Sequence, residues 1–253
     1  MWARARRRVM WTCGELLVTL GTVLALLVVH QLWWTNHQAE RGAQREVRAL
    51  EREWEEPGLP KSGSGSSSGS GSLDSAQQSP DSSSAAESSG PARATNSRSS
   101  THSWSQAYAI LSIPRLGLRV PVAEGVSKSR VLNRGYAGHY PGTQQPGQAG
   151  NFALAGHRNT HGEPFRYINR LRRGDAVQVE TVDAVYSYTV DRTLPQTSAR
   201  DDGVISPVPR STVRPAYGYR TPGYYLTLTT CTPEYTSRHR LVVWGRLTSM
   251  RPR

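Results

Sequence analysis

The residues best suited to chemistry gather around Cys231, which ends the alternating segment 224–231 of sequence YYLTLTTC. The only other cysteine, Cys13, adjoins an apolar N-terminal run. A thiol without a partner in its own domain pairs with another chain, packs in a core or acts as a nucleophile, since the thiolate is the reactive form. The residue types near Cys231 favour the nucleophile.

Two further reactive side chains also stand at strand ends: His157 follows the segment NFALAG, and Arg240 begins 240–247. If 224–231 and 240–247 pair antiparallel, Cys231 and Arg240 meet at one rim of a sheet. A histidine can protonate a leaving amine and later deprotonate an incoming one. An arginine can stabilise an oxyanion or hold a substrate carbonyl. Together these groups predict acyl transfer through a thioester, although each residue alone is more typical of a structural role.

The elements that must position these residues are short alternating segments punctuated by proline and glycine. Such a pattern predicts a mainly β domain, either a closed barrel or a sandwich. One helical turn is expected over 164–173, stopped by Gly174. The predicted strands include residues 109–113, 151–155, 176–180 and 185–190.

The N-terminal region predicts a single membrane anchor. Residues 1–15 are basic and precede an apolar run over 16–34, which as a helix spans about 28 Å, close to the hydrocarbon thickness of a bilayer. The charge bias puts the N-terminus in the cytoplasm and the following domain outside the cell, at the plasma membrane. A cleavable signal peptide is the alternative, but the run ends at Trp33 and Trp34 without small residues for cleavage.

Residues 35–56 predict a helical stalk, with Asn36 as a possible N-cap. Small and apolar residues recur along it at spacings of three and four and form one narrow stripe. The stripe consists of Ala39, Ala43, Val47, Leu50 and Trp54. It suits a self-associating stub or a solvated stalk that continues the membrane helix.

Residues 57–103 are a Ser/Gly-rich tract too poor in apolar residues to fold, so a disordered linker is expected before a catalytic domain at 104–253.

The formal net charge is +12, and most of the excess lies in residues 104–253. A basic domain outside the cell attracts wall polymers and lipid headgroups rather than nucleic acid; a solvated Arg-rich surface is the alternative. No Cys/His spacing of zinc type occurs, and the acidic residues are scattered. We therefore expect no metal and no other cofactor.

Residues 227–231, of sequence TLTTC, followed by Arg240 at the head of a Leu-Val-Val strand, are similar to the TLxTC…R signature of sortases. The block around His157, from 150 to 175, resembles the histidine block of sortases, and IPRLG at 113–117 and GHYPGT at 138–143 also match. The resemblance covers nearly all of 107–249 and is greatest to the class E group of high-GC Gram-positive bacteria.

The resemblance implies an eight-stranded β-barrel with one or two short helices and a catalytic set of His157, Cys231 and Arg240. Its substrates would be secreted proteins with a C-terminal LPxTG-like or LAxTG-like sorting signal, cleaved between Thr and Gly. The acceptor would be an amine of a lipid II-type peptidoglycan precursor. Tyr140, as reader of the second signal position, and Thr230 are the implied substrate-binding residues.

Two positions depart from the class E pattern: Thr232 and Glu234 stand where a histidine and a basic residue are expected, which leaves the exact signal open. A pilin-polymerising sortase is one alternative, although no Asp-Pro-aromatic lid motif precedes the domain. L,D-transpeptidases carry a His-Gly-Cys cluster, and papain-like hydrolases place Cys before His; neither pattern occurs here. A non-catalytic, membrane-tethered wall-binding module is the non-enzymatic alternative.

Overall fold

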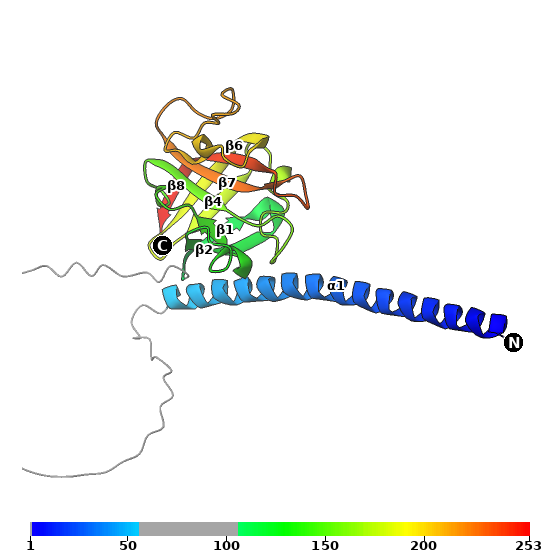
Figure 1. The fold of residues 1–253 in the computed structure, drawn as a ribbon. Helices are drawn as coiled ribbons and strands as arrows, with labels where there is room; N and C mark the ends of the chain where they lie inside the picture. The colour runs from blue at the N-terminus through cyan, green and yellow to red at the C-terminus, as the bar shows by residue number, and fades with distance from the viewer. Residues whose placement is uncertain (1, 56–105) are drawn as a thin grey trace, which may run out of the picture. The chain divides into compact units, whose positions relative to one another are not determined.

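A computed structural model of the chain describes residues 2–55 and 106–253 (Figure 1). The tract 57–103, expected to be a disordered linker, lies outside the described residues. Within the described ranges, the side chains of residues 2–10, 12, 13 and 32 are also left aside.

The N-terminal region forms one continuous helix, α1 (Trp2–Glu55). Its part Gly14–Glu55 contains a stretch that is long and apolar enough to cross a membrane. Asn36 lies inside α1, so the expected helix start at this residue is wrong. The reason is local: no proline interrupts residues 2–55, and the Ala-, Glu- and Arg-rich sequence after Asn36 has high helix propensity.

The apolar stripe on the second half of α1 packs against the domain that follows it. Ala43, Val47 and Leu50 are buried together with Ile110 and Ala123 of strands β1 (Ala107–Ile113) and β2 (Leu118–Glu124). Gln44 Nε2 donates to the carbonyl of Arg119 at 2.9 Å. The stripe is therefore neither solvated nor left free for self-association, since alternation along β1 and β2 turns an apolar outer face toward the small residues of the helix.

This packing predicts a position-specific stability effect on α1. Ala43→Asp would bury an unpaired carboxylate, whereas Ala49→Asp places the same group on the exposed side of the same helix. We expect the first change to lower the free energy of unfolding by about 2 kcal/mol and the second to leave it nearly unchanged. Thermal unfolding of the full chain in detergent measures both. Identical melting curves would contradict the packing of α1 on β1 and β2.

The folded domain is a closed eight-stranded barrel, as expected. Besides β1 and β2, its strands are β3 (Ala137–His139), β4 (Gly150–Ala155), β5 (Ala176–Glu180), β6 (Ala184–Ser198), β7 (Tyr224–Thr232) and β8 (His239–Pro252). Their order around the barrel is β1-β2-β3-β4-β7-β8-β6-β5, and neighbours are antiparallel except for the parallel pairs β2–β3 and β4–β7.

Within residues 106–253, helical structure is limited to four 3-10 turns: η1 (Pro114–Leu116), η2 (Leu132–Arg134), η3 (Ile168–Arg170) and η4 (Asp202–Ile205). The turn expected over 164–173 is reduced to η3. Phe165, Ile168 and Leu171 are all buried and recur every three residues, a spacing that a 3-10 turn places on one side. Packing of these three side chains explains the tighter turn.

Strand β7 is covered on both faces, which makes it a firm support for the residues at its end. Leu226 and Leu228 point into the barrel core. On the opposite face the Thr227 hydroxyl donates to Asn151 Oδ1 at 2.8 Å, and the segment between β6 and β7 lies over it through Val204. The same segment packs on Trp244 of β8. The end of β7 is therefore held from inside and outside the barrel.

Candidate active site

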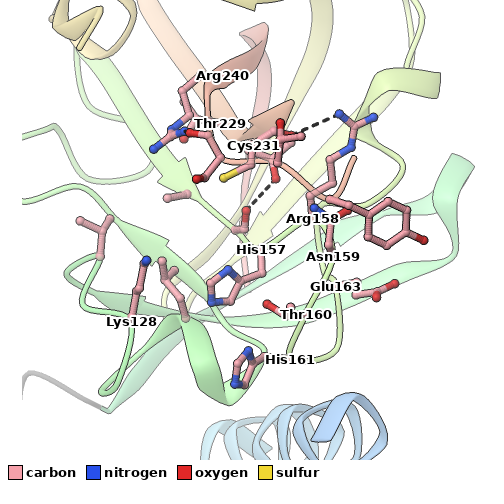
Figure 2. Close-up of a pocket in the computed structure, with 18 of the residues that line it drawn as sticks. Lys128, His157, Arg158, Asn159, Thr160, His161, Glu163, Thr229, Cys231 and Arg240 are labelled. Atoms are coloured by element: carbon pink, nitrogen blue, oxygen red, sulfur yellow. Dashed lines mark hydrogen bonds between the residues drawn. The ribbon is translucent and has the colours of Figure 1, made fainter. Parts of the chain in front are cut away.

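A cleft of about 990 Å³ opens at the rim of the barrel where β4 and β7 end and β8 begins. It is lined by His157, Cys231 and Arg240, and also by Tyr140 and Thr230. Figure 2 shows the sulfur of Cys231 pointing into the space between Arg240 and His157. The cleft thus brings together all five residues that the sequence singled out.

Cys231 and Arg240 are direct partners in the antiparallel register of β7 and β8. The pairing continues to Thr232 and His239, so the link between the strands is 233–238, shorter than the loop 232–239 expected from the sequence. The thiol is partly exposed and free. The Arg240 guanidinium is held by the residues just before it, because Nη1 donates to the carbonyls of Ser237 in the link and His239 at the start of β8, both at 3.1 Å.

His157 follows β4 and makes a hydrogen bond between Nε2 and Asn133 Oδ1 at 2.8 Å. Burial, and to a smaller extent the nearby positive charges of His161 and Lys128, lower the pKa of His157 from 6.5 to about 4. The ring is therefore neutral at pH 7. A neutral ring that donates Nε2–H to the Asn133 oxygen keeps Nδ1 as its basic nitrogen.

The lowered pKa of His157 predicts acid sensitivity of the fold. The unfolded chain takes up a proton near pH 6.5, whereas folded His157 does so only near pH 4. The free energy of unfolding should therefore fall as the pH drops from 6.5 to 4. Below pH 4 both states hold the proton, so His157 adds nothing further to the pH dependence of stability. Chemical denaturation of wild type and His157→Gln across this range measures it. The variant should show a shallower decline; parallel curves would contradict the shifted pKa.

The two residues predicted to bind substrate differ in what their hydroxyls contact. Tyr140 lines the cleft, and its hydroxyl lies 3.0 Å from Thr229 Oγ1. Thr230 is buried, and its hydroxyl donates to the carbonyl of Gly156 at 2.8 Å. The Thr230 hydroxyl therefore ties β7 to the residue before His157, while Tyr140 presents its ring to the cleft.

Several residues in or next to the cleft were not predicted from the sequence to belong to the site. Asn133, which lies in η2 and 24 residues before His157, contacts that histidine. Arg158 reaches the carbonyl of Cys231. Asn36 of α1 lines the cleft and donates through Nδ2 to Glu163 Oε1 at 2.8 Å. Each contact joins segments distant in sequence, so only the folded chain reveals it. Among the described residues no group of three or more His, Cys, Asp or Glu is arranged to hold a metal ion.

A closed eight-stranded barrel with a cysteine, a histidine and an arginine around one rim cleft is the arrangement of sortases, and the chain belongs to the sortase family: the family model described as "Sortase domain" matches residues 111–248. Within the family its likeness is to class E enzymes. It is 40% identical over 95% of its length to Sortase SrtE1 of Streptomyces coelicolor and spans 57% of that protein. It is 32% identical to Sortase SrtE2 of the same organism, over 92% of this chain and 80% of that one.

The solved structures give the same result. The crystal structure of Sortase E1 from Streptomyces coelicolor, with a tripeptide in its active site, covers 59% of this chain and 92% of its own. It is 51% identical over that region and superposes with a TM-score of 0.56. The chain thus spans just over half the length of the first curated relative but nearly all of the solved domain.

Proposed function

We propose that this protein is a membrane-anchored cysteine transpeptidase that cleaves a C-terminal LPxTG-like or LAxTG-like sorting signal between Thr and Gly. In this proposal the cleaved protein passes to an amine of a lipid II-type peptidoglycan precursor. The observation that carries the proposal is the β7–β8 register, in which Cys231 faces Arg240 on the cleft that also contains His157. The similarity to a sortase solved with a tripeptide in its active site supports a peptide substrate.

The first half-reaction forms a thioester. Because the pKa of His157 lies near 4, the neutral imidazole accepts the proton of the Cys231 thiol as the sulfur attacks the threonine carbonyl carbon. The C–S bond forms while the carbonyl oxygen gains negative charge, which Arg240 stabilises with its fixed N–H donors. The C–N bond then breaks, and His157 passes its proton to the departing glycine amine.

The second half-reaction reverses these steps with a new amine. The acceptor nitrogen attacks the thioester carbonyl and gives a proton to His157. The Cys231 sulfur leaves and recovers the proton, so the enzyme returns to its starting state and an amide replaces the thioester. No external reductant, oxidant or metal enters this balance. Water as the acceptor would give hydrolysis by the same route.

The proposed location follows from α1. Its apolar part is long enough to span a bilayer, and basic residues precede it. We propose a single-pass anchor with the N-terminus in the cytoplasm and the barrel outside, where both the secreted substrate and the membrane-held acceptor are available.

One experiment tests the reaction and its specificity. The full chain in detergent is incubated with sorting-signal peptides that differ only at the second position, and products are identified by mass spectrometry. Cleavage between Thr and Gly is the expected result, and a Tyr140→Phe comparison shows whether that residue reads the varied position.

A peptidoglycan-type amine and a lysine-bearing pilin-type peptide are compared as acceptors. Cleavage of none of the peptides would contradict the proposal, and preference for lysine would favour pilin polymerisation.

A further inference from the structure

Arg158, the residue after His157, is buried to an unusual degree for an arginine, with 7% of its surface exposed. Its Nη1 donates to the carbonyl of Cys231 at 3.2 Å and to Thr232 Oγ1 at 2.9 Å. Its Nη2 lies 3.8 Å from Glu234 Oε1. Figure 2 shows the side chain extending from the histidine segment to the end of β7. Arg158 therefore links the two segments that carry the catalytic cysteine and histidine.

Burying a guanidinium is costly unless hydrogen bonds and an opposite charge compensate it. Arg158 has that compensation only at its tip: its buried Nε–H has no hydrogen-bond partner among the described residues. The contacts to Cys231, Thr232 and Glu234 must therefore hold the side chain in place. A buried polar group that is incompletely satisfied calls for an explanation, and a role in catalysis is one.

The residues after Cys231 supply acceptors that match the donors and charge of Arg158. Thr232 offers its hydroxyl oxygen and Glu234 its carboxylate where the arginine points. A basic side chain at 234 would instead repel the guanidinium.

The contacts lie on both sides of His157. On its N-terminal side, Gly156 N donates to the carbonyl of Thr229 at 3.1 Å, and Gly156 O accepts from Thr230. On its C-terminal side, Arg158 contacts Cys231 and the residue after it. The histidine is therefore fixed to β7 at the two neighbouring positions, which limits how far its ring can move relative to the thiol.

The same side chain also orders the β7–β8 link. Glu234 and Ser237 lie in this link, and the carbonyls of Ser237 and of His239, the first residue of β8, accept from the guanidinium of Arg240. Loss of the Arg158 contacts would release the first part of the link and, through it, the support of Arg240. All three proposed catalytic groups would then lose part of their alignment.

We propose that Arg158 is a positioning residue of the transpeptidation site: without touching substrate, it holds His157, Cys231 and the link that supports Arg240 in reactive alignment. The expected effect on kcat rests on the proposed function, whereas the expected ordering of the link 233–238 does not. Misplacement of reacting groups by about 1 Å can cost a hundredfold in rate.

The kinetic test compares full-length variants in detergent on one sorting-signal peptide. Arg158→Met keeps a long side chain but removes its N–H donors. Arg158→Lys keeps the positive charge but removes the planar, forked guanidinium. Arg173→Met is the control, because that side chain is 84% exposed. We expect Arg158→Met to lower kcat by about a hundredfold with KM nearly unchanged, and Arg158→Lys to lower kcat by a smaller factor. Unchanged kcat in Arg158→Met overturns the proposal.

Amide hydrogen exchange gives a readout that needs no substrate. In Arg158→Met the link 233–238 should exchange faster than in wild type, while β1 and β2 should not change. If the wild type cleaves no peptide, the proposed function fails, and exchange alone then decides whether Arg158 orders the link; unchanged exchange overturns the inference. If Arg158→Met does not fold, Thr232→Val and Glu234→Gln each remove one partner and should lower kcat in the same way. Full kcat in both would overturn the proposal.

Discussion

Replacing Cys231 with alanine is expected to abolish cleavage of a sorting-signal peptide, by more than about a thousandfold relative to wild type. The reason is that no other group at the cleft can form the thioester. Cys231 is the only free cysteine among the described side chains, and Cys13 lies far away in the sequence, in α1. Peptide cleavage followed by chromatography, together with mass-spectrometric detection of the acyl-enzyme, measures the effect.

The control for this experiment uses the second cysteine. In a Cys13→Ser background, iodoacetamide reports on Cys231 alone, because the chain has two cysteines. That protein should be alkylated in the folded state and should lose peptide cleavage in step with alkylation. Its melting temperature and that of Cys231→Ala should stay close to wild type, since the thiol is partly exposed. Normal cleavage by Cys231→Ala would rule out the cysteine mechanism.

Arg240→Lys is expected to lose most of the activity, by about a hundredfold to a thousandfold in kcat. Lysine keeps the positive charge, so a purely electrostatic role would survive the change. It cannot keep the planar fork, in which Nη1 is held by the carbonyls of Ser237 and His239 while the other N–H groups remain available to the cleft. Steady-state kinetics on the same peptide measure the loss.

Arg251→Lys serves as the matched control, because Arg251 is an exposed arginine of the same strand, away from the cleft. It should keep wild-type kinetics. Full activity in Arg240→Lys would remove the proposed role of the guanidinium at the oxyanion or the substrate carbonyl. It would leave the thioester mechanism to Cys231 and His157.

The sequence alone predicted the pairing of Cys231 with Arg240, and the reason is topological. Two strands joined by a short link pair antiparallel with their adjoining ends together, so the end of one and the start of the next must be neighbours. His157 is different. It reaches the cleft because β4 lies parallel to β7, a pairing between segments about seventy residues apart that local pattern could not predict.

For the apolar stripe on α1, too, the sequence predicted the residues but not their partner. Spacings of three and four identified Ala43, Val47 and Leu50 as one face, and that face exists. Its partner could not be read from the sequence, because an apolar stripe is satisfied equally well by a second copy, a bilayer or a neighbouring domain. Only the folded chain shows it against β1 and β2.

Local chemistry thus predicted which residues are suited to react, which segments alternate and where the chain is apolar enough to cross a membrane. Tertiary structure alone decided the environment of those residues: the burial that keeps His157 neutral, its contact with Asn133, and the guanidinium of Arg158 that donates to the Cys231 carbonyl. The physical reason is that pKa values and buried polar contacts depend on groups brought together from distant segments, and local sequence carries no signal for them.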